Sequence, residues 1–156
     1  MKRVIFVEPI IENDEEIKKL FNKYNPDSSF VNPHICLVFP FESDLSTETI
    51  DSIFQKELQE VNEFNLQLSG LSISYEGKNN FLFLDVTDEE NNLKRISERL
   101  YRKLGSNATL RGEYTPHITI GKSKSPEEIE RVHDEAGEKR FLSRVSQPSV
   151  GNCSLQ

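Results

Sequence analysis

The sequence predicts an α+β protein built from two lobes that repeat one another. Residues 32–38 (NPHICLV) and 115–121 (TPHITIG) share a Pro-His pair, an isoleucine, a small polar residue and an aliphatic residue. Each copy also occupies the same place in a repeated series of strand, helix, histidine strand and helix. This repetition predicts lobes related by a pseudo-two-fold axis, with both histidines facing one central groove.

The two repeated segments have the composition and alternation of β-strands. Because successive strand side chains point to opposite faces, His34 and Cys36 are expected on one face, and His117 and Thr119 on the matching face of the other copy. The isoleucines and Leu37 are expected to point into the core.

The elements of the first repeat follow from local patterns. Residues 3–7 form an aliphatic strand candidate. Residues 13–16 (NDEE) have the pattern of a helix start, and the helix is expected to end near Asn25 and Pro26. After the first histidine strand, apolar residues recur at helical spacing between positions 50 and 61, which predicts a second amphipathic helix.

A hairpin is expected between the repeats. Residues 66–75 alternate, with a change of phase at Gly70 that is typical of a β-bulge. Residues 76–80 form a turn, and residues 81–86 are apolar on both faces except for Asp85.

The second repeat continues with a capping box at residues 87–90 (TDEE), which predicts the start of a third helix that ends at Gly105. The second histidine strand is expected at residues 114–122. Ser125 followed by Pro126 predicts the start of a fourth helix.

We expect residues 1–146 to form a single domain. Residues 141–145 are a candidate last strand, whereas residues 147–156, with a proline, a glycine and an asparagine, are expected to be a disordered tail. No apolar run approaches the roughly 20 residues of a membrane span, and the N-terminal segment lacks the pattern of a signal peptide. The protein is therefore predicted to be cytoplasmic. A monomer is the expected state, although the sequence carries no signal for the oligomeric state.

Composition restricts the partners. A net charge of −7 and a pI near 5.1 argue against a long nucleic-acid footprint, although a few local donors can hold a single phosphate. Cys36 and Cys153 lie too far apart in sequence to suggest a disulfide framework, and no histidines or cysteines have zinc spacing. No metal or cofactor is expected, and a small nucleotide or RNA terminus is the expected substrate.

Two convergent histidines suit acid-base chemistry near neutral pH, because one imidazole can accept a proton while the other donates one. A phosphodiester is a natural target, since its transition state needs in-line positioning and hydrogen-bond donors. Either histidine alone is more often a structural residue, and it is the pairing that favours a site.

The two motifs resemble those of the 2H phosphoesterases, which include RNA 2′,3′-cyclic phosphodiesterases and 2′-5′ RNA ligase-like proteins. Their signature of His-x-Thr/Ser-x, ending in an apolar residue, is similar to residues 34–37 (HICL) and 117–120 (HITI). The resemblance implies a bilobal fold of two antiparallel-sheet lobes with helices outside. It also implies metal-independent hydrolysis of 2′,3′-cyclic or 2′-5′ phosphodiesters, with His117 as base, His34 as acid and Thr119 donating to phosphate.

Cys36 departs from this signature, because a thiol is a weaker donor than the hydroxyl it replaces. We therefore keep two alternatives to the enzyme: a nucleotide- or RNA-end-binding module with weakened catalysis, and a scaffold without phosphate affinity. Cys36 is expected to be a small inward-facing residue rather than a nucleophile.

Several other residues are candidates for a role in the site, and for most of them a structural role is an alternative. Three aromatic residues are candidates for base stacking or for core packing: Phe39, Phe41 and Tyr114. Lys122 is a candidate either for phosphate binding or for a plain surface role, whereas Lys124 is expected at the surface. His133 is expected to face solvent.

Overall fold

The computed structural model describes residues 1–137, 142–145 and 149–152, with side chains placed for residues 1–137. The elements, in chain order, are β1 (Lys2–Glu8), α1 (Glu15–Tyr24), β2 (Ile35–Glu42), α2 (Thr47–Leu58), β3 (Phe64–Glu76), β4 (Asn79–Thr87), α3 (Asn92–Leu104), a 3₁₀ turn (Gly105–Asn107), β5 (His117–Ser123), α4 (Pro126–Ala136), β6 (Leu142–Val145) and β7 (Ser149–Asn152). The strands form one antiparallel sheet in the order β6-β3-β4-β5-β2-β1-β7. The predicted α+β class is confirmed.

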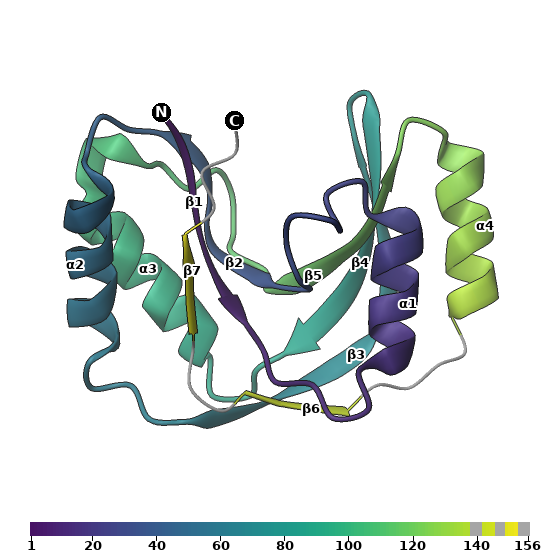
Figure 1. Ribbon diagram of the computed structural model, residues 1–156, viewed down its shortest axis with the longest axis horizontal. Coiled ribbons are helices and arrows are strands. Elements are labelled where there is room, and N and C mark those ends of the chain that lie inside the picture. The colour runs from purple at the N-terminus through teal and green to yellow at the C-terminus, as the bar shows by residue number, and fades with distance from the viewer. Residues whose placement is uncertain (138–141, 146–148, 153–156) are drawn as a thin grey trace.

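The sheet bends into two lobes at its middle (Figure 1). The first lobe consists of β7, β1 and β2, and the second of β5, β4, β3 and β6. In the described residues the lobes are joined through a single ladder pair between β2 and β5, Ile35 with Ile118. The predicted bilobal arrangement is thus confirmed, with the two histidine strands at the seam.

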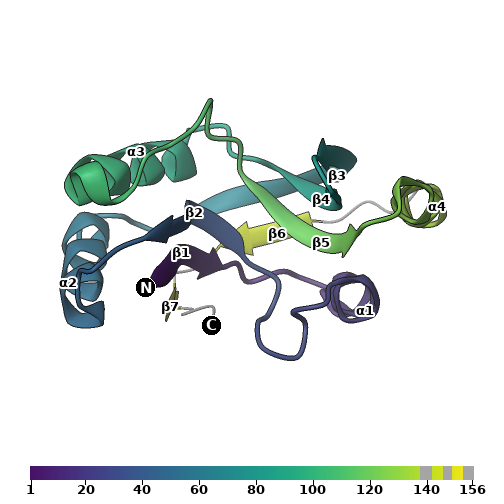
Figure 2. The same cartoon turned by 90° about the horizontal axis from the view of Figure 1, so that it is seen from above.

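The helices lie outside the sheet, and two of them, α1 and α3, are exchanged between the lobes. Helix α1 follows β1 of the first lobe but packs against β5 of the second, whereas α3 follows β4 of the second lobe and packs against β2 of the first. Viewed from above, α1 and α4 flank one end of the sheet, and α2 and α3 flank the other (Figure 2). This reciprocal crossing ties the lobes together and preserves the repeat.

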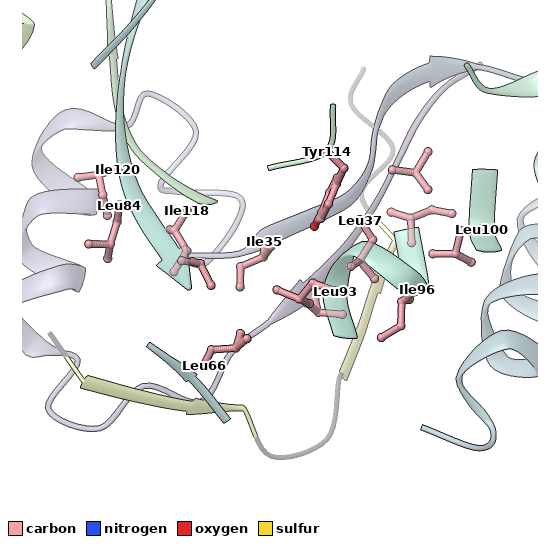
Figure 3. Close-up of a cluster of buried hydrophobic side chains, with 14 of the residues drawn as sticks. Ile35, Leu37, Leu66, Leu84, Leu93, Ile96, Leu100, Tyr114, Ile118 and Ile120 are labelled. Carbon is pink, nitrogen blue, oxygen red and sulfur yellow. The ribbon is translucent and has the colours of Figure 1, made fainter. Parts of the chain in front are cut away.

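One hydrophobic core runs across the seam (Figure 3). Ile35 and Ile118 are both fully buried, and side chains from α3 such as Leu93 and Leu100 continue the cluster into the first lobe. Full burial of an aliphatic side chain contributes about 1.5–3 kcal/mol. The seam is therefore a packed part of the core, which holds the histidine strands in a fixed register.

Both histidine strands carry a β-bulge at the same place. Against β1, the register passes from Cys36 to Val38, so that Leu37 is the extra residue. Against β4, it passes from Thr119 to Gly121, with Ile120 as the extra residue. The internal repeat therefore extends to the irregularities of the backbone.

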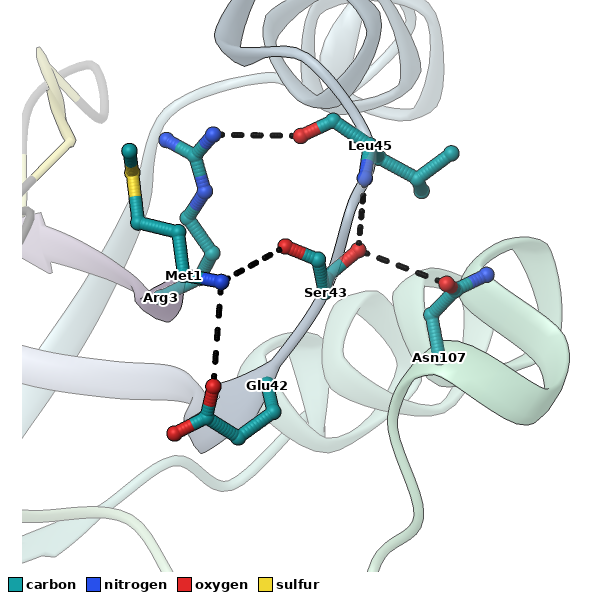
Figure 4. A network of polar contacts seen from close by, with 6 residues as sticks. All are labelled: Met1, Arg3, Glu42, Ser43, Leu45 and Asn107. Carbon is teal, nitrogen blue, oxygen red and sulfur yellow. Dashed lines mark hydrogen bonds and ion pairs between the residues drawn. The ribbon is translucent and has the colours of Figure 1, made fainter.

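A polar network fastens the start of β1 to the end of β2 (Figure 4). The amino group of Met1 donates to the Ser43 carbonyl at 3.2 Å, and Arg3 donates to the Leu45 carbonyl at 3.1 Å. The Ser43 hydroxyl donates to the side chain of Asn107 at 3.3 Å. These contacts hold the first-lobe strands together at the end away from the seam.

Most of the predicted elements are confirmed, including the bulge at Gly70, where the β3–β4 register shifts, and the helix start at Ser125, whose hydroxyl accepts from the Glu128 amide. The predicted helix start at the capping box of residues 87–90 was wrong. Thr87 ends β4, and α3 begins only at Asn92 because the Asp88 carboxylate accepts from the Leu93 amide at 2.7 Å.

The prediction for the tail was wrong in part. Ser149–Asn152 form β7, which pairs with the edge of β1 instead of remaining coil. The candidate last strand is confirmed as β6, which pairs with β3. The other residues of the predicted tail lie outside the described part of the chain. Among described residues, no helix is both long and apolar enough to cross a membrane.

Candidate active site

The two histidines meet at the seam. Because Ile35 pairs with Ile118 in an antiparallel ladder, continuing the register by one residue places His34 beside Thr119 and His117 beside Cys36. Directly opposed residues share a face of the sheet, with Cβ atoms about 4.5–5.5 Å apart. The four polar motif residues thus lie on the face opposite the buried isoleucines, as the alternation predicted.

Each histidine is held in the same way by its own strand. The Nδ1 atom of His34 lies 2.8 Å from the Asn32 carbonyl oxygen, and Nδ1 of His117 lies 2.9 Å from the Thr115 carbonyl oxygen. A carbonyl oxygen can only accept, so each Nδ1 carries the proton. Nε2 is left as the atom of each ring that can exchange a proton with a substrate.

An aromatic ring packs against each imidazole from a neighbouring strand. The ring centroids of Phe6 and His34 are 4.6 Å apart, and those of Phe83 and His117 are 3.9 Å apart. Phe6 pairs with Cys36 and Phe83 with Thr119, so the two phenylalanines are equivalent in the repeat. These contacts restrict the orientation of both imidazoles, and sequence reasoning missed both residues.

The backbone of each motif is anchored by a side chain from the loop that precedes the other motif. The Asn25 amide donates to the Thr119 carbonyl at 3.1 Å, and the Tyr114 hydroxyl donates to the Cys36 carbonyl at 2.8 Å. Both anchors are nearly buried, at 9% and 4% exposed. Tyr114 is therefore a structural residue, and of its two interpretations core packing applies.

The electrostatic environment favours a neutral His117. Burial lowers the pKa of His117 below its usual value, while the Thr115 carbonyl and the carboxylate of Asp85 oppose that shift. Positive charge on His34 lowers the pKa of His117 further, which reflects the closeness of the two rings. At neutral pH, His117 is suited to accept a proton.

Asp85 is a further residue of this site. It pairs directly with His117 in the β4–β5 ladder, and the Ser72 hydroxyl donates to its carboxylate at 2.7 Å. The signal for it in the sequence was a single acidic residue in an otherwise apolar strand. Burying such a residue is costly unless it is hydrogen-bonded, which Ser72 provides.

Cys36 is a half-buried neutral thiol. Burial raises the pKa of its thiol to about 12, so the thiolate is not available for nucleophilic chemistry near neutral pH. The expected role as a small inward-facing residue agrees with this burial. The second cysteine of the chain, Cys153, lies outside the described residues.

The bulges decide which residues beyond the motifs lie on the same face of the sheet as the histidines. After the extra residue Ile120, Lys122 pairs with Phe81 and therefore shares a face with Thr119. Its amino group lies 5.8 Å from the centre of the Phe81 ring, and the side chain is exposed. Lys122 is thus available on the histidine face of β5.

Phe39 occupies the position in β2 that matches Lys122. Its ring centroid lies 6.1 Å from that of His117, with the ring planes 20° apart, so that it crosses the seam between the lobes. Phe41 is different, because a second register shift between Arg3 and Ile5 returns it to the core, where it is 8% exposed. Core packing therefore applies to Phe41, whereas Phe39 borders the site.

His133 lies away from this site and was expected to face solvent, which was wrong. Its Nε2 atom donates to the Leu71 carbonyl at 3.2 Å, which links α4 to the bulged part of β3. Among residues 1–137, no group of three or more histidine, cysteine or acidic residues has the geometry of a metal site.

Comparison with known proteins identifies the family. The family model of the 2′-5′ RNA ligase superfamily matches residues 6–148. The chain belongs to this superfamily. The resemblance of the two histidine motifs to the 2H phosphoesterases is thereby confirmed, and the matched region contains both motifs.

Two bacterial relatives named "Putative phosphoesterase" support the same family. The protein from Bacillus pumilus is 26% identical over 107 residues, which is 68% of this chain and 61% of that protein. The protein from Oceanobacillus iheyensis is 27% identical over 135 residues, covering 85% of this chain and 76% of the relative. The chain therefore matches less than two thirds of the length of the Bacillus protein.

Solved structures share the fold. Usb1 from Kluyveromyces marxianus aligns with a TM-score of 0.62 and 14% identity, covering 99% of this chain and 98% of Usb1. The structure of the same protein with uridine monophosphate aligns with a TM-score of 0.56 and 11% identity over the same shares. At these identities the likeness concerns the fold.

Proposed function

We propose that this superfamily member is a phosphodiesterase that hydrolyses 2′,3′-cyclic phosphates or 2′-5′ phosphodiester bonds in RNA ends or nucleotides, without a metal. The observation that carries the proposal is the matched pair of histidines at the seam, each held through Nδ1 with Nε2 left for proton exchange. Superfamily membership and the Usb1 structure solved with uridine monophosphate support a small nucleotide or RNA end as the ligand.

In the proposed reaction, Nε2 of His117 removes a proton from water, and the water oxygen bonds to phosphorus. The bond between phosphorus and the ribose 3′ oxygen breaks, and His34, which enters this step protonated on both ring nitrogens, donates its Nε2 proton to that oxygen. A cyclic substrate then yields a nucleoside 2′-phosphate. The lowered pKa of His117 supports its assignment as base, because the base must be neutral before it accepts a proton.

Phosphate binding is assigned to Thr119, Lys122 and Cys36. The first two share the histidine face of β5, where a hydroxyl and an ammonium group can both donate to the non-bridging oxygens. Cys36 occupies the matching place on β2, but its neutral thiol donates only weakly. The two lobes therefore contribute unequally to phosphate binding, because the donors on β5 are stronger than the thiol on β2.

This inequality favours a second candidate, a nucleotide- or RNA-end-binding module with little catalysis. It would retain the ammonium group of Lys122 and the hydroxyl of Thr119 but stabilise the transition state poorly at Cys36. The two candidates differ in turnover and agree on phosphate binding.

Hydrolysis of the four nucleoside 2′,3′-cyclic monophosphates and a short RNA with a cyclic end, in the presence of EDTA, tests the proposal. The wild-type chain is expected to turn over at least one of them, and His34→Ala and His117→Ala are expected to lose at least 100-fold in rate. His133→Ala is the matched control. Activity that survives both substitutions contradicts the two-histidine mechanism, and binding without turnover supports the second candidate.

A further inference from the structure

A cavity of about 160 Å³ lies between the end of β1, the first turns of α1 and the segment that leads into β2. Its apolar wall includes Ile11, Ile17 and Pro33, and its polar wall includes Glu8 and Asn32. Figure 2 shows the two connections on either side of α1, and both connections contribute lining residues to the cavity. No step of the proposed reaction uses this cavity.

The polar wall of the cavity is shared with the first histidine. Asn32 accepts from Nδ1 of His34 through its backbone carbonyl, while its side-chain amide lies 3.4 Å from a Glu8 carboxylate oxygen. Glu8 is two residues after Phe6, the ring that packs on His34, and therefore points to the same face of β1. A ligand in the cavity would thus lie next to the phosphate site.

We propose that this cavity binds the nucleobase of the substrate and selects guanine, an inference that rests on the proposed function. The cavity is smaller than the ~300–1,000 Å³ of pockets that enclose a whole drug-sized ligand, so its scale is one ring system. Half of its lining residues are apolar and half are polar or charged, and in such sites a few convergent polar groups fix the orientation of the ligand.

The polar groups determine which base fits. A carboxylate only accepts hydrogen bonds, and the guanine edge carries a ring N–H beside an exocyclic amino group, which match the two oxygens of Glu8. The neighbouring guanine O6 can accept from the Asn32 amide. Adenine presents a ring nitrogen lone pair toward the carboxylate, and uracil and cytosine each offer one donor there.

The charges around the cavity leave Glu8 free for this role. Lys18 forms an ion pair with Asp14 at 2.6 Å, so these two lining residues compensate one another. Within the residues whose side chains are described, Glu8 forms no salt bridge within 4.0 Å, and the Asn32 amide is its side-chain hydrogen-bond partner. Its carboxylate can therefore exchange this long contact for a base edge.

Calorimetric titration of the full chain with the four nucleoside 2′-monophosphates tests the proposal without requiring turnover. Wild type is expected to bind the guanosine nucleotide at least tenfold more tightly than the other three, since a matched bidentate pair discriminates by about that factor. Glu8→Gln and, independently, Asn32→Ala are expected to reduce this preference about tenfold. Glu63→Gln, the same chemical change on an exposed loop residue, is the control and should keep it.

Equal affinities for the four nucleotides overturn the inference. A guanosine preference that survives both Glu8→Gln and Asn32→Ala also overturns it. The same holds if no nucleotide binds. Thermal unfolding of each variant separates loss of selectivity from loss of the fold. Failure of the proposed function appears differently, as binding of nucleotides without hydrolysis of any cyclic nucleotide. In that case the nucleotide affinities of wild type and the variants still test whether the cavity selects guanine.

Discussion

Asp85 lies directly opposite His117 in the ladder between β4 and β5, and Ser72 holds its carboxylate through a hydrogen bond of 2.7 Å. Burial is the largest influence on His117 and lowers its pKa, whereas the negative charge of Asp85 acts against that shift. The hydrogen bond to the Thr115 carbonyl opposes the effect of burial more strongly than Asp85 does. The balance among these influences determines the pH at which the proposed base becomes neutral.

Asp85→Asn is expected to move the acidic limb of the pH profile of kcat/KM to lower pH. Removal of the carboxylate disfavours the imidazolium, so the pKa of His117 falls further below the usual value of about 6.5. The acidic limb of kcat/KM reports the pKa of the catalytic base in the free enzyme. Asp44→Asn, an exposed substitution after the end of β2, should leave the limb in place, and a shift to higher pH would contradict the account.

Lys122→Ala is expected to weaken phosphate binding, with KM for cyclic nucleotides raised about tenfold. Lys124→Ala, two residues later and also exposed, is the matched control and should change KM by less than about twofold. The comparison at low and high salt checks the cause, because the difference between the variants should shrink as salt screens the charge. Equal effects of the two substitutions on KM would contradict the view that the bulge at Ile120 brings Lys122 to the phosphate.

Gly121→Ala is expected to lower the free energy of unfolding by about 1–3 kcal/mol. A Cβ atom at this position would lie 3.0 Å from Cβ of Tyr24 and 3.4 Å from the Tyr24 carbonyl oxygen, neither of which is the end of a flexible side chain. Urea unfolding measures the loss, and the exposed Lys122→Ala variant provides a control. An unchanged midpoint would show that α1 can move away from β5 at little cost.

Cys36→Thr is expected to raise kcat for cyclic nucleotides several-fold, since it replaces a weak donor by a hydroxyl at the position equivalent to Thr119. Thr119→Cys, the reciprocal change, should lower kcat by a similar factor. Steady-state kinetics on the two variants and wild type measures both effects. A rate that stays the same or falls in Cys36→Thr would mean that the site accommodates the thiol in another way.

The sequence was sufficient to predict the histidine strands, the repeat and the bilobal fold, because these follow from short local patterns that occur twice. The bulges could not be predicted from alternation. Strict alternation places Lys122 with Ile118 and Ile120 on the core face, and the extra residue in β5 reverses this. Such a bulge depends on pairing with a distant strand, which has no local signature.

Long-range pairing also explains the other differences. Residues 149–152 lack strand composition but pair with the open edge of β1. The capping pattern at residues 87–90 competes with β4, which extends through Thr87 and leaves Asp88 to cap a later helix start. Asp85 was visible in the sequence as a lone acidic residue, but its contact with His117 depends on the register of two strands.

The central claim is that both site histidines carry their proton on Nδ1 and offer Nε2 to one phosphate. Long-range proton–nitrogen correlation spectra of ¹⁵N-labelled protein, recorded where the rings are neutral, report each tautomer directly. We expect the Nδ1–H form for His34 and His117, shifts at both Nε2 atoms when a nucleoside monophosphate is added, and the Nε2–H form for His133, which donates to Leu71. An Nε2–H tautomer at either site histidine, or a response from only one of them, would contradict the account.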